Sequence, residues 1–548
     1  MANDLHGEFL RELAALDEFL GARRSPERAV EPEDPDVRRL MESLAFFSAR
    51  TREAATAELR HAVNRLAQGL LDDFVEAQPA RAMLRAIPSP RLTEPARLPR
   101  GTRVRLETAN GEIGEFSTMR ELTIRPLELD RAELQMRGSG YRVLIRLRGY
   151  GPSANCDDPL ALHIDHLGDY QASAQLFDHL AKHLQRVTVV YGDPPSPSEL
   201  GHSCGVSFGP LREGHDSSAF ADELRSQQRS GTIARLRKFF HLPGTELSLE
   251  IDLARAARPW RQAWLCLDLD QWPEGQAVNK EMFRLFVVPI ENLVSELAEP
   301  IKCDGTRSLH PIVAWRNDGS IAFHSVLEVQ QELARGMDLV LPGHLARGEE
   351  SWDLEYEDER REPLLHLRLP GAFLEPRMVM VRARWYQPGF DAVAVGKLEA
   401  KLYSRHLEGV GFRVQGRLVP HRRSPLSGDP RAMLHLLSRR SKRVLSREDI
   451  IMIMAALGAD SRSHHRDIES ELRHIEVIDE PSNVRSGGGV RHVYRVLLGD
   501  IASERRPLVD DYLRGVEELL DAWSSNPVVI RVDEPSVRKR PEIVRTAS

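Results

Sequence analysis

Residues 87–116 read IPSPRLTEPARLPRGTRVRLETANGEIGEF, and the periodicity of the chain changes within this stretch. Four prolines between Pro88 and Pro99 interrupt the helical pattern that precedes them. After the prolines, Val104 and Leu106 alternate with polar residues, and Asn110-Gly111 is typical of the two-residue turn of a β-hairpin. The stretch therefore predicts that a helical segment ends here and that β-rich structure follows.

Upstream of this break, apolar residues recur at helical spacing. A first helix is expected to end at Gly21, and Asp34-Pro35 then predicts an N-cap with proline at the first helical position. In this second helix Leu40, Leu44 and Phe47 lie three or four residues apart, which places them on one face. The stripe fits packing within the domain or against another chain, and both alternatives remain open at this point.

Downstream of the break, strands and short helices alternate irregularly. This pattern favours an α+β fold with several mixed, β-rich domains over a doubly wound sheet. We predict an N-terminal helical bundling segment over residues 1–87, a β-rich mixed domain over 88–260 and a second mixed α/β domain over 261–420. A C-terminal α+β domain over 421–548 completes the chain. The basic segment at its start, residues 417–447, fits a solvated face or contact with an acidic protein surface.

Composition limits the class of protein. The 548 residues carry 75 Lys and Arg against 82 Asp and Glu, a formal net charge of -7, which gives no global reason to expect nucleic acid as a partner. The four cysteines form no C-x-x-C pair, so neither a disulfide framework nor a zinc ribbon is predicted. The N-terminus lacks a signal-peptide pattern, and the longest apolar run, Ile450 to Leu457, is too short to span a bilayer. A soluble protein of a reducing, cytosol-like compartment is expected.

Two strings have the residue types of a reactive site. Residues 201–205, GHSCG, satisfy G-x-S-x-G, in which a strand-to-helix turn exposes the serine to a histidine. A proline-rich segment precedes Ser203, so its context favours a glycine-bearing loop over a serine hydrolase. His179 and His183 are spaced as zinc ligands on a helix, but the glutamate of H-E-x-x-H is missing, which favours surface or partly buried histidines. We therefore predict no catalytic residue, no cofactor and no metal.

Several strings occur in the order that a known family shows. Residues 34–50, DPDVRRLMESLAFFSAR, are similar to D-P-x-V-x-R-L-x-E-x-x-A-F-x-x-A-R, and Ile87-Pro88-Ser89 resembles the P-I-P-S break of that family. Residues 236–243, LRKFFHLP, fit a segment in the middle of the chain, and residues 298–308, AEPIKCDGTRS, fit A-E-P-I-x-x-D-x-T-R-S. On these motifs the chain resembles the TssF (ImpG/VasA) family, a baseplate subunit of bacterial type VI secretion systems.

The string at 298–308 is the most specific match. Arg307 is expected to form a bidentate, charge-assisted pair that fixes this segment, and the alternative is an exposed arginine. Gly305 stands where the family commonly has histidine. The positions of the motif that we interpret as structural are Glu299, Pro300, Asp304, Thr306 and Arg307.

The resemblance implies a scaffold and not an enzyme. Family members assemble as two TssF copies with one TssG, and engage TssK and TssE around the VgrG spike in the cytoplasm beneath the inner-membrane complex. The fold would be related to contractile-tail baseplate wedge proteins, with neither nucleic acid nor direct membrane insertion. In that picture the N-terminal helices bundle the chains, and Leu40, Leu44 and Phe47 are the interface anchors. The alternatives are a wedge-like baseplate protein of another contractile injection system, or a serine hydrolase using Ser203.

Overall fold

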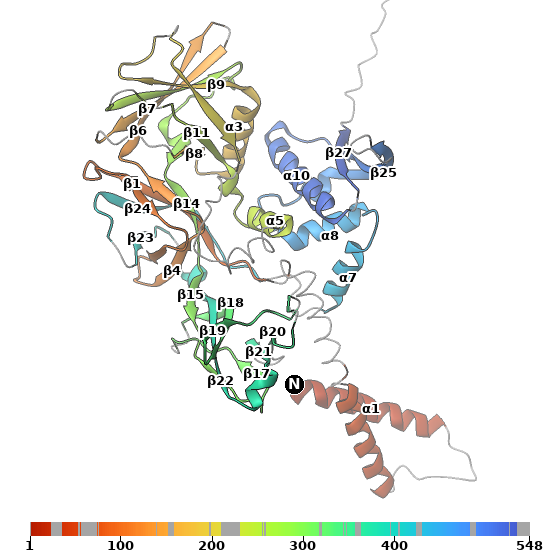
Figure 1. Cartoon of the computed structure of the whole chain (residues 1–548). Coiled ribbons are helices and arrows are strands. Elements are labelled where there is room, and N and C mark those ends of the chain that lie inside the picture. The colour runs from red at the N-terminus through yellow and green to blue at the C-terminus, as the bar shows by residue number, and fades with distance from the viewer. Residues whose placement is uncertain are drawn as a thin grey trace, which may run out of the picture.

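A computed structural model gives the architecture of the chain (Figure 1). The predicted cap at Asp34 lies outside the described residues, as does most of the predicted stripe between residues 53 and 73. The structure describes residues 2–22, 35–52, 55, 74, 76–138, 140–151, 158–196, 199–209, 231–254, 256, 259–316, 320–343, 345–346, 348–356, 363–394, 396–403, 406–423, 430–482, 489–524 and 526–533.

The chain begins with two helices, α1 (Ala2–Ala22) and a second helix over residues 35–52. We call this pair the helical hairpin, and Figure 1 shows it standing apart from the β-rich remainder of the molecule. Polar contacts join the two helices, since Ser48 donates to Glu12 at 3.0 Å and Arg52 pairs with the same carboxylate at 2.7 Å. Within the described residues, no helix is long and apolar enough to cross a membrane.

A closed six-stranded barrel lies at the middle of the molecule (Figure 1). The hairpin predicted near Asn110 is confirmed, but its connection is longer than two residues, since β3 ends at Glu107 and β4 begins at Ile113. Within it the amide of Thr108 donates to the carbonyl of Glu112 at 2.9 Å. Around the barrel the strands follow the order β1 (Arg81–Pro88), β14 (Val287–Glu291), β4 (Ile113–Thr118), β3 (Arg103–Glu107), β23 (Glu399–Leu402) and β24 (Val410–Val419).

A second body is inserted between the barrel strands β4 and β14, and we call it the large sheet. The inserted segment also contains α3 (Tyr170–His183), which packs against the sheet, and α5 (Thr232–His241), which packs against the C-terminal domain. The small ribbon β2 (Ala96–Leu98) with β5 (Leu122–Ile124) leads into the sheet. Its order is β13 (Phe283–Leu285), β8 (Leu160–Ile164), β11 (Ser248–Asp252), β10 (His202–Phe208), β9 (Leu184–Tyr191), β12 (Gln262–Leu269), β7 (Gly140–Gly149) and β6 (Leu127–Arg137).

A third body, which we call the small domain, covers residues 294–386 between β14 and β23 and has its own apolar core. One sheet contains β15 (Val294–Leu297), β22 (Arg377–Tyr386), β18 (Ala322–Leu333) and β19 (Gly336–Leu339), with β16 (Ile301–Cys303) also paired to β22. The other contains β17 (Leu309–Pro311), β21 (Pro363–Arg368) and β20 (Ser351–Tyr356). The short helix α6 (Phe390–Val393) returns the chain to the barrel.

The C-terminal domain packs helices against a three-stranded sheet of β25 (Leu472–Ser482), β26 (Gly489–Leu498) and β27 (Val528–Asp533). Its helices are α7 (Pro430–Arg440), α8 (Arg447–Leu457), α9 (Ile468–Glu471) and α10 (Arg506–Trp523). A capping box between Ser446 and Asp449 starts α8, and Gly458 at φ 115° ends it. Buried residues of this domain, such as Tyr512, belong to the same core cluster as those of the barrel and the large sheet.

The α+β, β-rich fold class predicted from the sequence is confirmed. The predicted segment boundaries do not follow the sheets, because the barrel takes strands from residues 81–419 and is interrupted by both inserted bodies. The boundary at residue 87 passes through β1, and the boundary at residue 260 separates β11 from β12 within the large sheet. The helical segment therefore ends before residue 81.

Candidate partner surface and the joints that hold it

The helical hairpin buries one stripe of its second helix. The two helices approach closely because Ala45 and Ala49 are small, and a spacing of four places both residues, with Met41, on the same side of the helix. The opposing side of α1 carries Phe9, Leu13 and Leu16, each half-buried. The buried stripe consists of Met41, Ala45 and Ala49.

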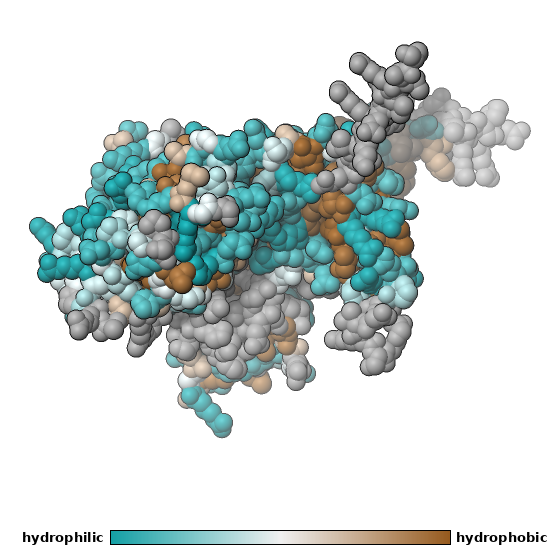
Figure 2. All heavy atoms as spheres, turned by 90° about the horizontal axis from the view of Figure 1, so that it is seen from above, coloured by the Kyte–Doolittle hydropathy of each residue, from teal (hydrophilic) through white to brown (hydrophobic). Residues whose placement is uncertain are grey.

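The residues predicted as interface anchors form a different stripe. Leu40, Leu44 and Phe47 are 73%, 56% and 66% exposed, so the described part of the chain does not cover them. A contiguous run of large apolar side chains left in water is unfavourable and typical of a protein–protein contact. On the face of the molecule shown in Figure 2, by contrast, the surface is mostly hydrophilic and its apolar residues lie in scattered groups. That the stripe meets a partner chain stays a prediction.

The chain enters the barrel through a short stretch that other parts of the molecule hold firmly. We call residues 76–81 the entry segment. From α5, Arg237 donates to the carbonyl oxygen of Glu76 at 2.6 Å, and the Nε2 of His241 lies 2.7 Å from the carbonyl oxygen of Pro79. The helix α5 lies beside the C-terminal domain (Figure 1), so the entry segment is anchored on that side.

The small domain contacts the same stretch from another direction. The Nε2 of His324, on β18, lies 3.1 Å from the carbonyl oxygen of Ala77, and its Nδ1 lies 3.5 Å from the carboxylate of Glu76. Burial lowers the pKa of His324, so the ring is neutral near pH 7 and donates from Nε2 to the carbonyl. The end of β24 adds a backbone bridge between Gln78 and Arg422.

An ion pair completes the entry segment at its barrel end. Arg81, only 4% exposed, donates to Glu291 on the neighbouring strand β14 at 3.2 Å. Burial lowers the pKa of Arg81, while the charge of Glu291 opposes that effect. Burial alone would raise the pKa of Glu291, but the nearby Arg81 and Arg384 hold it below its ordinary value. Both groups are therefore charged at neutral pH, and neither is replaceable without leaving the other buried and unpaired.

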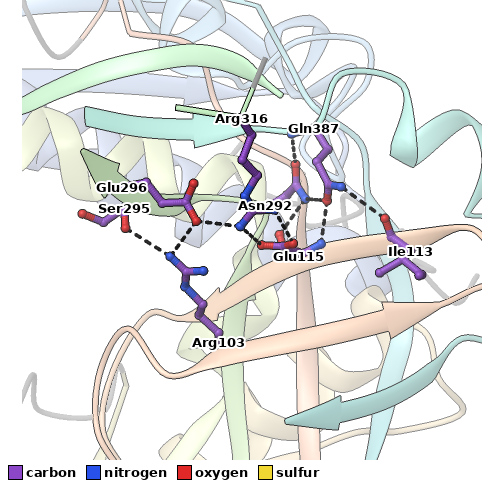
Figure 3. Close-up of polar contacts among 8 residues, drawn as sticks. All are labelled: Arg103, Ile113, Glu115, Asn292, Ser295, Glu296, Arg316 and Gln387. Atoms are coloured by element: carbon purple, nitrogen blue, oxygen red, sulfur yellow. Dashed lines mark hydrogen bonds and ion pairs between the residues drawn. The ribbon is translucent and has the colours of Figure 1, made fainter. Parts of the chain in front are cut away.

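A polar network joins the barrel to the small domain (Figure 3). Arg316, which follows β17, donates to both carboxylate oxygens of Glu115 on β4, at 2.8 and 3.2 Å, and to Glu296 on β15 at 2.6 Å. Arg103 on β3 donates to the same Glu296 at 3.0 Å. Two arginines and two carboxylates thus alternate across the joint, and contact with Glu115 raises the pKa of Arg316 further above its ordinary value.

Asn292 and Gln387 extend this network at the two connections between the bodies. The amide nitrogen of Asn292 donates to the backbone carbonyl of Glu115 at 2.8 Å, and its oxygen accepts from the backbone amide of Gln387 at 2.8 Å. Gln387 in turn donates to the carbonyl of Ile113 at 3.2 Å. The segment that leaves the barrel at Asn292 and the segment that returns to it at Gln387 are therefore both bonded to β4.

The most specific sequence motif folds as part of the small domain. The amide of Glu299 donates to the carbonyl of Val313 at 2.9 Å, and Pro300 directly precedes β16. The carboxylate of Asp304 accepts from the amide of Thr306 at 3.0 Å and from its hydroxyl at 2.6 Å. These bonds close a local turn, in which the hydroxyl and amide of Thr306 lower the pKa of Asp304.

The structure explains the residue type at Gly305 of this turn but not at the neighbouring Arg307. The bidentate pair expected for Arg307 does not form with any described residue, and its exposed side chain matches the alternative. Gly305 has φ 75°, and a Cβ there would lie 2.8 Å from the Cα of Phe373. The backbone conformation and the close approach of Phe373 therefore explain glycine at a position where the resembled family commonly has histidine.

The two candidate reactive strings do not form sites in the described residues. Ser203 lies exposed within β10, opposite Thr188 of β9, so the predicted loop is wrong and the strand-to-helix turn of a hydrolase is absent there. His179 contacts the carbonyl of Gln271 at 3.0 Å, and His183 contacts Asp270 at 3.0 Å. No group of three or more metal-ligating side chains occurs among the described residues.

The basic segment at 417–447 is partly neutralised inside the chain. Asp449, at the start of α8, pairs with Arg439 at 2.8 Å and with Lys442 at 2.7 Å. Arg443 pairs with Asp479 at 3.2 Å. A count of charges within the segment missed these acids because they follow it in the sequence.

Comparison with known proteins identifies the family. The model described as "Type VI secretion system, TssF" matches residues 15–362, which is more than half of the chain. The chain belongs to the TssF family. The match covers the helical hairpin from residue 15, the barrel strands up to β14, the large sheet and most of the small domain. No curated protein sequence matches the chain.

Two solved structures share the fold of this TssF-family chain. A chain of a type VI secretion TssK-TssF-TssG baseplate subcomplex superimposes with a TM-score of 0.70 at 16% identity, covering 91% of this chain and 96% of that one. A chain of "the baseplate complex from the type VI secretion system" gives a TM-score of 0.59 at 15% identity, with 97% and 96% covered. The shared fold therefore extends over almost the whole of this chain and of each of the two solved chains.

Proposed function

We propose that this chain is a structural subunit of a type VI secretion baseplate wedge, where it assembles with TssG and TssK through the helical hairpin. The observation that carries the proposal is the family match, which includes most of the hairpin. The exposed apolar stripe of the hairpin supports it as the partner contact. TssK, TssF and TssG occur together in the solved subcomplex of similar fold. The proposal extends to two copies of this chain per TssG, to contacts with TssE and the VgrG spike, and to a cytoplasmic baseplate beneath the inner-membrane complex.

The hairpin is suited to bundling because one of its apolar stripes is buried between its own helices and the other is exposed. Met41, Ala45 and Ala49 hold the two helices together, which leaves Leu40, Leu44 and Phe47 for a further helix. Full burial of a Leu or Phe side chain contributes about 1.5–3 kcal/mol. Three such residues at a spacing of three and four match the anchors of a helix in a groove or bundle.

Charge substitutions on the two stripes test the proposal. Leu44→Asp and Phe47→Asp place a charge at the partner contact, and we expect them to abolish co-purification with TssG while the melting temperature of the isolated chain stays unchanged. The matched control is Met41→Asp, on the same helix but 7% exposed, which we expect to disrupt the hairpin itself and lower helix content. Normal co-purification of the Leu44 and Phe47 variants would show that another surface binds TssG.

The proposal assigns no catalysis, cofactor or nucleic acid to the chain. The position of Ser203 within a strand gives no support to a serine hydrolase, and a fluorophosphonate probe is expected to leave it unlabelled. The alternative of another contractile injection system is decided by the partners. Assembly with TssK and TssG of the same genome supports the type VI baseplate, and assembly only with the wedge proteins of a different contractile apparatus would replace it.

A further inference from the structure

Three arginines converge on one aspartate on the large sheet. Arg142 on β7 and Arg186 on β9 both stand directly opposite Asp268 on the strand β12 between them, so the three side chains share a face. Arg142 donates to Asp268 from Nε at 2.6 Å and from Nη2 at 3.2 Å, and Arg186 donates to it at 2.9 Å. Arg137, at the end of β6, donates to the same carboxylate at 2.9 Å. We call this set the arginine row.

The arginine row has more cations and donors than its own acid satisfies. Burial alone would raise the pKa of Asp268, but Arg142 and Arg186 hold it below its ordinary value, so one anion faces three cations. Asp268 already accepts four hydrogen bonds, which is about the capacity of a carboxylate. Arg142 is buried and donates a further bond to the carbonyl of Glu199 at 3.1 Å. Arg137 and Arg186 each use one contact, and their side chains are 25% and 39% exposed.

The charge of Glu199 also acts on Arg142, and the carboxylate of Glu199 accepts from the amide of Ser196 at 3.2 Å. Two other acids of the described chain are engaged elsewhere. Asp270 lies 3.0 Å from His183, and Glu133 pairs with Arg131 at 2.8 Å. One exposed apolar residue adjoins the row: Leu200, 57% exposed, directly follows Glu199, whose backbone carbonyl accepts from Arg142. Exposed arginines beside an apolar side chain are typical of protein–protein contacts.

We propose that the arginine row is a second docking surface, which binds an acidic, apolar-bearing segment of a partner protein. Carboxylates of the partner pair with the free donor edges of Arg137 and Arg186, in the fork geometry that guanidinium groups offer. Leu200 covers an apolar side chain of the same segment. Charge complementarity selects an acidic occupant, and the exposed Leu200 beside the row favours a protein segment with apolar side chains over nucleic acid.

A docking role and a purely structural role of the row predict different changes in the melting temperature. If the ion network exists to hold the sheet, neutralising Arg137 and Arg186 removes bonds to Asp268 and lowers the melting temperature. If the two arginines serve to bind a partner, neutralising them relieves repulsion among three cations, and Arg142 still neutralises Asp268. The isolated chain then keeps or raises its melting temperature and loses only binding.

The experiment uses the full-length chain carrying Arg137→Gln and Arg186→Gln together. The control is Arg148→Gln, on the same sheet, where Arg148 is 57% exposed and pairs with Glu128 at 3.3 Å. The probe is a fluorescein-labelled peptide of alternating Glu and Leu, followed by anisotropy at low and physiological salt. Single-stranded DNA and phosphatidylserine vesicles are measured in parallel.

We expect the double variant to bind the peptide at least tenfold more weakly than the wild type, with an unchanged or higher melting temperature. The control variant should bind like the wild type. Equal peptide affinity in the double variant and the control overturns the proposal, as does a lower melting temperature of the double variant with unchanged binding. Tighter binding of DNA or vesicles than of peptide overturns the assignment to a protein partner. The hairpin variants Leu44→Asp and Phe47→Asp should leave peptide binding intact, which separates this surface from the proposed TssG contact.

Discussion

Arg316 of the small domain and Glu115 of the barrel form a bidentate ion pair, with contacts of 2.8 and 3.2 Å (Figure 3). The two residues are 201 positions apart in the sequence and lie on different bodies. Arg316 also holds Glu296, so the removal of its guanidinium leaves two carboxylates facing each other across the joint. The pair therefore fixes how the small domain is set on the barrel.

Arg316→Ala should destabilise this joint. Since the side chain of Arg316 is 32% exposed, solvent screening reduces the loss, and we expect about 1–3 kcal/mol. Arg316→Lys should behave almost like Arg316→Ala, because an ammonium group cannot reproduce the fork contact with Glu115. Urea unfolding of the full chain measures the change. Arg382→Ala is the control, since Arg382 is 56% exposed and lies 3.8 Å from Glu328 in the same domain. A lysine variant as stable as the wild type would contradict the bidentate role.

The entry segment should become accessible to protease when its contacts are removed. Arg237→Ala frees the carbonyl of Glu76, and His324→Ala removes the contact with Ala77, so the backbone there opens more often. A glutamate-specific protease should then cleave after Glu76 several times faster than in the wild type. Arg235→Ala is the control on the same helix, because Arg235 pairs with Glu246 and Glu518 instead. Equal cleavage rates in all variants would mean that the segment is held by the barrel strand alone.

The joint of α3, α5 and α10 should give the stability a pH dependence. Burial raises the pKa of Asp511 to about 6 from an ordinary value of 3.8, with Arg514 opposing the effect and Glu246, Asp178 and Asp510 adding to it. Because the folded-state pKa is the higher one, the linked stability is complete below about pH 4 and is lost as the pH rises through about 6. The difference corresponds to at most about 3 kcal/mol.

Asp511→Asn removes this titration. We expect the variant to be more stable than the wild type above pH 7 and to show a flatter stability profile between pH 4 and 7, measured by urea unfolding across that range. Asp521→Asn is the control, because Asp521 lies exposed on the same helix, well beyond Asp511. Identical slopes for the Asp511 variant and the wild type would remove Asp511 as the cause.

Local pattern was enough to predict those elements whose signal lies within a few residues. The alternation at Val104 and Leu106 predicted β3 and β4, and the helical spacing of Leu40, Leu44 and Phe47 predicted the second helix of the hairpin. Ser203 shows the limit of a local motif. Its glycines and the proline-rich segment before it suggested a loop, whereas pairing of His202, Ser203 and Cys204 with β9 makes this stretch a strand.

Contacts that depend on distant segments had no signal in the sequence. The barrel closes because β1 pairs with β14 in one direction and with β24 in the other, and residues 81 and 291 meet only in the fold. The contacts that hold the entry segment are made to its backbone carbonyls, which every residue type carries. No residue pattern could therefore predict these contacts. The arginine row likewise depends on residues far apart in the sequence, since Asp268 lies 126 positions after Arg142 and 82 after Arg186.

The last prediction separates the helical hairpin from the body by truncation. Deletion of residues 1–52 removes the hairpin and keeps the entry segment and β1, so the β-rich body should retain its melting temperature and fail to co-purify with TssG. Deletion of residues 1–88 removes β1, whose Ala82 and Leu84 are fully buried between β14 and β24, and this chain should not fold. Circular dichroism and co-purification with TssG measure both outcomes. If the shorter deletion still assembles with TssG, the partner surface lies in the body, and the arginine row is the first place to look for it.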